Sequence, residues 1–218
     1  CDKRLGEVLD EMDSHQMWED TMLIVWTDHG YLLGEHEHWA KLIPPWYQEV
    51  ANTPFFVWDP RCKKAGERRE ALVQPSLDLG PTLLEFFGLK PSADMLGKPL
   101  ADTIANDAKV RDAALFGHHG GRVNVTDGRY VYMRKAVNVD NTPLYNYTLM
   151  PCHVESMFSP SELAGAELAG PFSFTKNCPL LRVPATIEWS QQHDDQLLFD
   201  VSQDPEQRNP IDNSQTEQ

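Results

Sequence analysis

The chain has 218 residues, with 33 aspartates and glutamates against 19 lysines and arginines, and its formal net charge is −14. This acidic surplus repels nucleic-acid phosphates at long range, and no Lys/Arg-rich stretch reverses it locally, so no nucleic-acid partner is expected. No apolar run approaches the roughly 20 residues that a membrane-spanning helix requires. The cysteines Cys1, Cys62, Cys152 and Cys178 lack the spacing of a zinc finger or a redox motif and leave the cellular compartment open.

The first part of the chain predicts a helix and two buried strands. Apolar residues recur at helical spacing between charged ones over residues 2–14, which indicates an amphipathic helix. Residues 21–27 and 54–58 are short apolar runs bounded by polar turn residues. Runs of this kind predict strands covered on both faces, as in a parallel α/β sheet.

A second helix is predicted before residue 89. It begins at Ser76 or Asp78 as a cap, tolerates Pro81 in its first turn, and ends at Gly88. Residues 89–108 then indicate a loop with two prolines. The α/β portion is therefore expected to cover residues 1–108.

The remaining residues, 109–218, predict a small α+β subdomain with an antiparallel sheet. Asp127-Gly128 separates two β-rich runs, 123–126 and 129–133, and this pattern is a strong hairpin signal because both central positions of a type I′ turn need positive φ. Strands are also predicted at 114–116 and 197–201. Residues 135–192, rich in proline, asparagine and serine, are predicted to be irregular.

The most suggestive polar residues are Asp28 and His29, directly after the first buried strand. Ligands of open α/β sheets bind outside the carboxyl ends of strands, so a carboxylate and an imidazole there are well placed for a metal. Lys41 follows across a glycine-containing loop that could fold back over the strand end. Its ammonium could neutralise an anionic oxygen beside the metal.

These segments resemble a known family. TMLIVWTDHGYLLGEHEHWAK, NTPFFVWDP, SLDLGPTLLEFFGLKPSADMLGKPL, DGRYVYMR and LLFDVSQDPEQRNP occur in the order found in the C-terminal part of sulfatases, members of the alkaline-phosphatase-like superfamily. The resemblance covers nearly the whole chain, and residues 135–192 are its least typical part. It implies the C-terminal portion of the sulfatase catalytic α/β domain, followed by the small C-terminal subdomain.

The resemblance also implies a chemistry. In sulfatases a formylglycine, made from cysteine or serine and carried as its hydrate, attacks sulfur while a divalent cation, usually Ca²⁺, holds the sulfate oxygens. Asp28 and His29 match the second pair of metal ligands, and Lys41 matches the lysine that contacts the sulfate. Because calcium prefers oxygen ligands, His29 leaves Mg²⁺, Mn²⁺ and Zn²⁺ open as well.

The sulfatase nucleophile motif and the first metal pair are missing from the chain, and Cys178 lies on the wrong side of the metal pair to replace the nucleophile. We therefore expect a C-terminal fragment whose formylglycine lies upstream, inactive and weakly cation-binding by itself. Its exposed apolar face and strand edges predict self-association or a need for the upstream half of the domain.

Three histidines are further candidates for substrate contact. His36 lies in the loop between the metal pair and Lys41, and a structural hydrogen bond is an equal alternative for it. His118 and His119 follow a predicted strand; since adjacent side chains of an extended chain point to opposite sides, at most one of them should face a site. The expected substrate is a sulfated small molecule or saccharide, of unspecified identity.

Two other functions compete with the sulfatase interpretation. Asp-His-Gly also occurs in metal-dependent phosphodiesterases and phosphotransferases of the same superfamily, where imidazole suits zinc. The other alternative is a non-catalytic binding module that kept the fold. The sequence upstream of Cys1 would distinguish these possibilities, because it would contain or lack the nucleophile motif.

Overall fold

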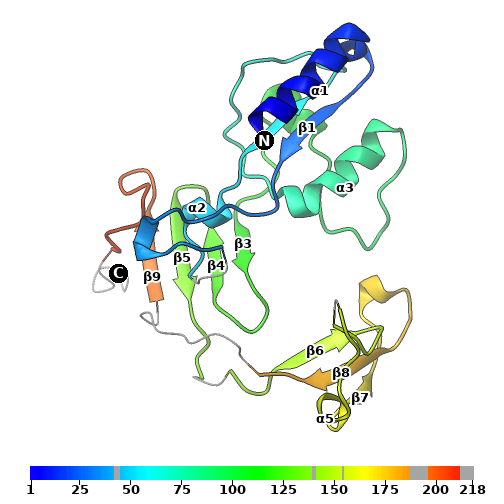
Figure 1. Cartoon of the computed structure of the whole chain (residues 1–218), viewed down its shortest axis with the longest axis vertical. Helices are drawn as coiled ribbons and strands as arrows, with labels where there is room; N and C mark the ends of the chain where they lie inside the picture. Colours follow the sequence, from blue (N-terminus) through cyan, green and yellow to red (C-terminus); the bar gives the residue numbers. More distant parts are fainter. Residues whose placement is uncertain (42–44, 139–140, 154, 187–195, 212–218) are drawn as a thin grey trace.

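A computed structural model describes residues 1–41, 45–138, 141–153, 155–186 and 196–211 (Figure 1). The described elements are α1 (Asp2–Ser14), η1 (Met17–Glu19), β1 (Leu23–Trp26), η2 (Glu35–Glu37), α2 (Gln48–Ala51), β2 (Phe55–Trp58), α3 (Pro75–Phe86), α4 (Ala101–Asn106), β3 (Ala114–Gly117), β4 (Val123–Thr126), β5 (Tyr130–Arg134), β6 (Tyr145–Thr148), α5 (Pro160–Leu163), β7 (Glu167–Ala169), η3 (Ser173–Thr175), β8 (Leu180–Pro184) and β9 (Gln196–Asp200). Among them, no helix has the length and apolar character to cross a membrane.

The N-terminal region contains the helix and the two strands predicted for it. β1 and β2 pair in antiparallel register, from Leu23 opposite Trp58 to Trp26 opposite Phe55. The expectation of a parallel arrangement is therefore wrong for this pair, because an apolar run indicates burial but carries no information about strand direction. Phe56 of β2 is 65% exposed, in line with the uncovered apolar face that is expected of these strands without the upstream part of the domain.

Helix α3 begins slightly earlier than predicted and is anchored by its own aspartate. Gln74 is the residue that precedes the first turn, and Pro75 occupies the first helical position. Asp78 is not the cap; its carboxylate is fully buried and accepts a hydrogen bond from the Gln74 amide at 2.8 Å. Helix α4 forms inside the segment that was predicted to be a loop. The sequence did not indicate this helix because six residues are too few to show a helical period.

The four-stranded sheet has the order β3-β4-β5-β9, and all its pairs are antiparallel. The predicted hairpin at Asp127-Gly128 is confirmed by the pairing of β4 with β5, but its turn is not of type I′, because Gly128 has φ 98° whereas Asp127 does not have positive φ. The Asp127 carboxylate instead accepts hydrogen bonds from the amides of Arg129 and Tyr130. One face of this sheet carries a buried apolar cluster with Val131, Met133, Leu197 and Phe199.

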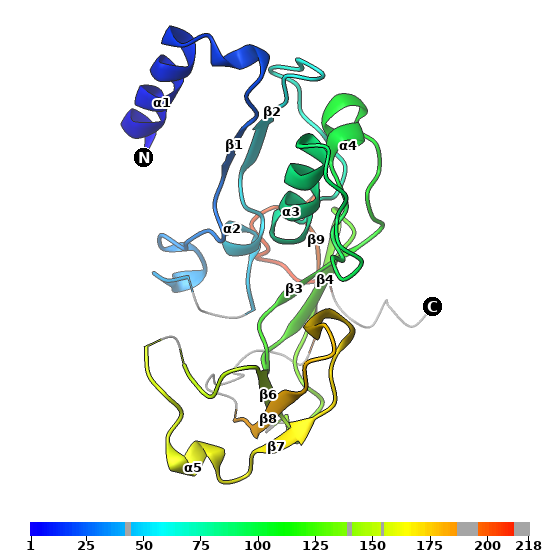
Figure 2. The same cartoon turned by 90° about the vertical axis from the view of Figure 1, so that its right-hand side faces the viewer.

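A second antiparallel sheet, β6-β8-β7, occupies the region predicted to be irregular. Its strands have only three to five residues and their apolar side chains do not alternate regularly, so the sequence pattern did not reveal them. Figures 1 and 2 show this sheet to one side of β3-β4-β5-β9, away from α1 and β1.

The segment after β1 packs on the four-stranded sheet. Tyr47 belongs to the same buried cluster as Val131 and Phe199. A neighbouring cluster joins Leu32, Trp46 and Val50, with Phe116 of β3 packed against it. The expected division between residues 1–108 and 109–218 stays a prediction, and these contacts cross it.

Candidate functional site

Asp28 and His29 lie immediately beyond the end of β1, as predicted. The Asp28 carboxylate accepts a hydrogen bond from the His29 amide at 3.0 Å, and the Thr27 hydroxyl is 3.4 Å from the same oxygen. The other Asp28 oxygen, Oδ2, lies 3.6 Å from Nε2 of His29. The side chain of Asp28 is 76% exposed and that of His29 is 36% exposed, so both are accessible to a ligand.

The protonation states of this pair suit a cation. Desolvation raises the pKa of the Asp28 carboxyl, but the hydrogen bond from the His29 amide and the charge of His29 outweigh it, so the pKa lies below its ordinary value. Nδ1 of His29 lies 3.0 Å from the carbonyl oxygen of Gly30. A carbonyl only accepts, so Nδ1 is the donor in this contact, and a neutral imidazole with its proton on Nδ1 would offer the lone pair of Nε2 to a cation.

The two donor atoms fit half of a metal site. Metal bonds to carboxylate oxygen and imidazole nitrogen measure roughly 2.0–2.6 Å, so donors 3.6 Å apart can share one cation. A complete site needs further ligands. Within the described part of the chain, no group of three or more His, Cys, Asp or Glu side chains is arranged to hold a metal ion.

Gly30 connects this pair to α2. Its amide donates to the carbonyl of Val50 at 2.9 Å, and a Cβ at position 30 would lie 1.8 Å from the carbonyl oxygen of Glu49. Only glycine permits this approach of two backbones. The end of β1 is thereby held against α2.

The loop that carries Lys41 folds back as the sequence suggested. Leu32 and Ala40 exchange two backbone hydrogen bonds, of 2.8 and 3.2 Å, and the Gly34 amide donates to the His38 carbonyl. Lys41 therefore directly follows the residue that pairs with Leu32, and Leu32 is two positions beyond Gly30. Its side chain is exposed.

His36 points away from solvent within this loop. Its ring stacks on Tyr47, with centroids 3.5 Å apart and planes inclined by 6°. Nε2 of His36 lies 3.6 Å from Oε2 of Glu49. The side chain of His36 is only 12% exposed.

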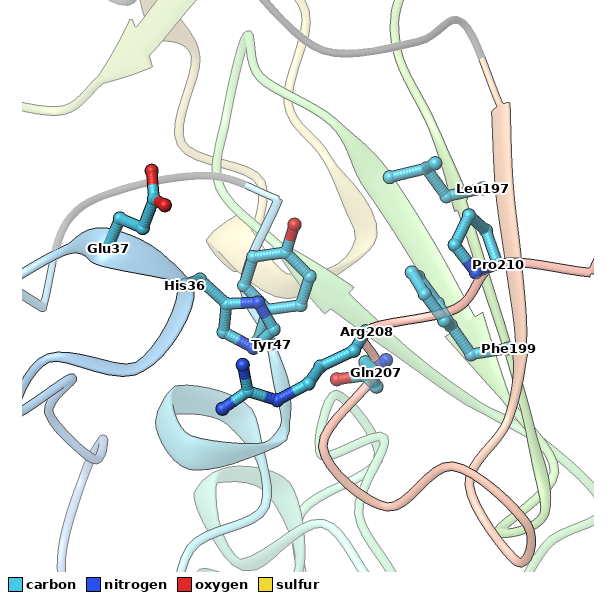
Figure 3. A pocket seen from close by; sticks show the side chains of 8 residues that line it. All are labelled: His36, Glu37, Tyr47, Leu197, Phe199, Gln207, Arg208 and Pro210. Carbon is cyan, nitrogen blue, oxygen red and sulfur yellow. The ribbon is translucent and has the colours of Figure 1, made fainter.

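A pocket of about 420 Å³ opens beside these rings (Figure 3). In Figure 3 the guanidinium of Arg208 reaches toward His36 and Tyr47, and Leu197, Phe199 and Pro210 form the opposite wall. Gln207 also lines the pocket; its side chain is buried, and its Oε1 accepts a hydrogen bond from the Gln48 amide at 2.7 Å. The C-terminal segment thus attaches to α2.

His118 and His119 point to different neighbours, in line with the expectation for adjacent residues. The ring of His118 lies beside Trp46, with centroids 5.8 Å apart. Nε2 of His119 lies 2.9 Å from the carbonyl oxygen of Tyr145 in β6. His118 therefore contacts the segment just before α2, and His119 connects to the sheet β6-β8-β7.

The sequence analysis missed several residues that position the site. Tyr47 is buried beneath His36; burial raises the pKa of its phenol, the charge of Glu49 adds to this effect, and that of Arg122 opposes it. Asn124 is fully buried, and its amide donates to the Pro45 carbonyl at 2.7 Å. Such contacts join residues far apart in the sequence, and no local pattern indicates them. Trp46 packs in the core, whereas Trp39 is 69% exposed.

Comparison with known proteins finds similarity to sulfatases. Residues 1–89 match the family model described as Sulfatase. A protein named Sulfatase from Formosa agariphila is 31% identical over 133 residues, which cover 60% of this chain and 25% of the relative. An N-acetylglucosamine-6-O-sulfatase from Bacteroides thetaiotaomicron is 24% identical over 175 residues, which cover 75% of this chain and 31% of the relative.

A solved structure extends the match to the fold. A protein in complex with its substrate D-glucosamine-2-N,6-O-disulfate superposes with a TM-score of 0.63 at 18% identity, over 96% of this chain and 33% of the other. The fold class is therefore the mixed α/β, alkaline-phosphatase-like fold of this structure, with antiparallel sheets in the C-terminal part. The chain is similar to sulfatases over most of its length, and its residues 1–89 match the family model. It spans about a quarter to a third of the length of these relatives.

Proposed function

We propose that the protein to which residues 1–218 belong hydrolyses the sulfate esters of a saccharide, and that this chain supplies half of its cation site and a sulfate-binding lysine. The observation that carries the proposal is the pair Asp28 and His29 at the end of β1, with Oδ2 and Nε2 3.6 Å apart. Its position in the segment matched to the sulfatase family supports this assignment.

Asp28 and His29 are assigned as ligands of one divalent cation. The lowered pKa of Asp28 keeps its carboxylate charged at neutral pH, and the hydrogen bond at Nδ1 leaves Nε2 of His29 free to coordinate. When bound, the cation would draw electron density from sulfate oxygens. Ca²⁺ is our first choice, and the mixed oxygen and nitrogen donors keep Mg²⁺, Mn²⁺ and Zn²⁺ as candidates.

Lys41 is assigned to the sulfate. Its loop returns to the end of β1 through the paired hydrogen bonds of Leu32 and Ala40, which supports a place near Asp28. An ammonium held there would stabilise the negative charge that develops on oxygen in the transition state.

The substrate is assigned as a sulfated saccharide. The relative from Bacteroides thetaiotaomicron carries the name of an N-acetylglucosamine-6-O-sulfatase, and the superposed structure holds a disulfated glucosamine. A sulfated amino sugar is therefore the first substrate to test. We place the formylglycine nucleophile and the remaining metal ligands outside residues 1–218, so the chain by itself should be inactive.

The test uses the full-length protein with 4-nitrophenyl sulfate and glucosamine-6-sulfate. Lys41→Ala should lower kcat by a factor of ~10²–10³, because a charge contact made in the transition state is lost. Asp28→Ala should lower activity and metal content together. Lys90→Ala, at an exposed lysine after α3, is the control and should change neither.

The outcome separates the competing functions. Wild-type turnover in a folded Lys41→Ala protein, or full metal occupancy in Asp28→Ala, would remove those residues from the site. Hydrolysis of bis(4-nitrophenyl) phosphate in place of the sulfate ester would establish the phosphodiesterase alternative. Saccharide binding without hydrolysis of either ester would establish a binding module.

A further inference from the structure

His36 has surroundings that differ from those of a substrate-binding histidine. One face of its ring is covered by Tyr47 at a centroid distance of 3.5 Å, and its Nε2 faces the carboxylate of Glu49. Both side chains that it meets belong to α2 or to the residue that precedes it. The imidazole is therefore directed at the protein framework.

The backbone of this segment needs external support. His36 and the next residue, Glu37, have φ of 52° and 61°, a left-handed conformation that side chains with a Cβ seldom adopt. Residues keep such conformations where their surroundings hold them. The stack on Tyr47 provides this hold, since Tyr47 is itself 9% exposed and packs on Phe199 in the core of the four-stranded sheet.

Helix α2, with Tyr47 just before it, contacts both the segment next to the metal pair and the loop that leads to Lys41. Val50 of α2 accepts the hydrogen bond from Gly30, next to the metal pair, while Tyr47 and Glu49 meet His36. His36 lies in the middle of the loop that Leu32 and Ala40 close. A displacement of His36 would therefore move this loop, and Lys41 with it, relative to Asp28.

We propose that His36 is a positioning residue, which sets the position of Lys41 relative to Asp28 and His29 by stacking on Tyr47. This inference deepens the proposed function and rests on it. We assign most of this positioning effect to the stack on Tyr47, because the 3.6 Å between Nε2 of His36 and Oε2 of Glu49 exceeds a hydrogen-bond length. Of the two roles that the sequence leaves open for His36, a substrate contact and a structural contact, this proposal takes the structural one.

The first test measures kcat and KM of the full-length protein with 4-nitrophenyl sulfate. His36→Ala should lower kcat by ~10–100-fold with little change in KM, since a small misplacement of a catalytic group costs this much. His36→Phe should retain kcat within about threefold, because its ring can stack on Tyr47 and the adjacent pocket has room for the larger ring. Leu33→Ala, in the same loop and 61% exposed, is the control and should leave kcat unchanged.

The second test asks whether His36 acts through Lys41. If it does, adding His36→Ala to Lys41→Ala should lower kcat by less than a factor of two, because coupled residues are not additive. Hydrogen exchange of the peptide that contains residues 32–40 should be faster in His36→Ala than in the wild type or in His36→Phe. This measurement does not depend on turnover.

The results that would overturn the inference are separate from those that bear on the function. If wild-type protein hydrolyses the sulfate but His36→Phe is as impaired as His36→Ala with a raised KM, His36 contacts substrate. Additive losses in the double variant, or unchanged hydrogen exchange, would also refute positioning. A wild-type protein without sulfatase activity would instead refute the proposed function.

Discussion

The ion pair between Asp78 and Arg111 should be the most sensitive electrostatic contact in the N-terminal region. The side chain of Asp78 is 0% exposed and that of Arg111 is 13% exposed. Two hydrogen bonds of 2.6 Å join the guanidinium to the two carboxylate oxygens. The carboxylate also accepts from the amides of Gln74 and Lys98, so it connects α3, the loop after it and the chain before β3.

Asp78→Ala would leave the buried guanidinium and two backbone amides without their acceptor. Removal of one partner of a buried ion pair typically costs about 3–5 kcal/mol in the free energy of unfolding. Since 1 kcal/mol shifts Tm by roughly 2–4 °C in a domain of about 200 residues, the expected loss is on the order of 6–20 °C, and less in a longer chain.

Differential scanning calorimetry of the full-length protein would measure this shift. The matched control is Asp112→Ala, since Asp112 follows Arg111 directly but pairs with Lys109 on the surface, where its side chain is 91% exposed. Exposed ion pairs contribute little to the free energy of unfolding, so this variant should have the same Tm as the wild type. Equal small shifts in the two variants would refute the assignment of a buried, structurally required pair.

Further predictions concern the pH dependence and two backbone contacts. Burial raises the pKa of the Asp78 carboxyl, but the hydrogen bonds from Arg111 and two backbone amides outweigh it, so that the pKa in the folded protein is lowered. The ion pair therefore stabilises the fold fully above the unfolded pKa of about 3.9, and this stabilisation is lost as the pH falls through the pKa of the folded protein. The Tm difference between wild type and Asp78→Asn should therefore be constant from about pH 5 to pH 8 and narrow below about pH 4; a constant difference at pH 3 would contradict this. Gly30→Ala would place a Cβ 1.8 Å from the Glu49 carbonyl oxygen and push the end of β1 away from α2, so metal content and turnover should both decrease. Normal metal content in this variant would show that the cation site does not depend on the contact between β1 and α2. Asn124→Ala removes the buried donor to the Pro45 carbonyl and should cost about 1–3 kcal/mol in urea unfolding, whereas an unchanged midpoint would mean that this contact is dispensable.

Several features of the fold followed from local sequence patterns. The apolar periodicity of residues 2–14 predicted α1, and Asp127-Gly128 predicted the hairpin of β4 and β5. The same local reasoning placed Asp28 and His29 at the end of a strand, because a polar pair after an apolar run is visible in the sequence alone. Roles for these residues and for Lys41 came from the family resemblance and stay predictions.

Short elements and long-range contacts were decided only by the tertiary structure. The strands of β6-β8-β7 have too few residues for a period to show, and their pairing connects residues more than ten positions apart. The antiparallel direction of β1 and β2 depends on the path of the chain between them. The sequence contains both His36 and Tyr47, but only the fold stacks them, since their contact arises when the loop at residues 32–40 packs beside α2 on the four-stranded sheet.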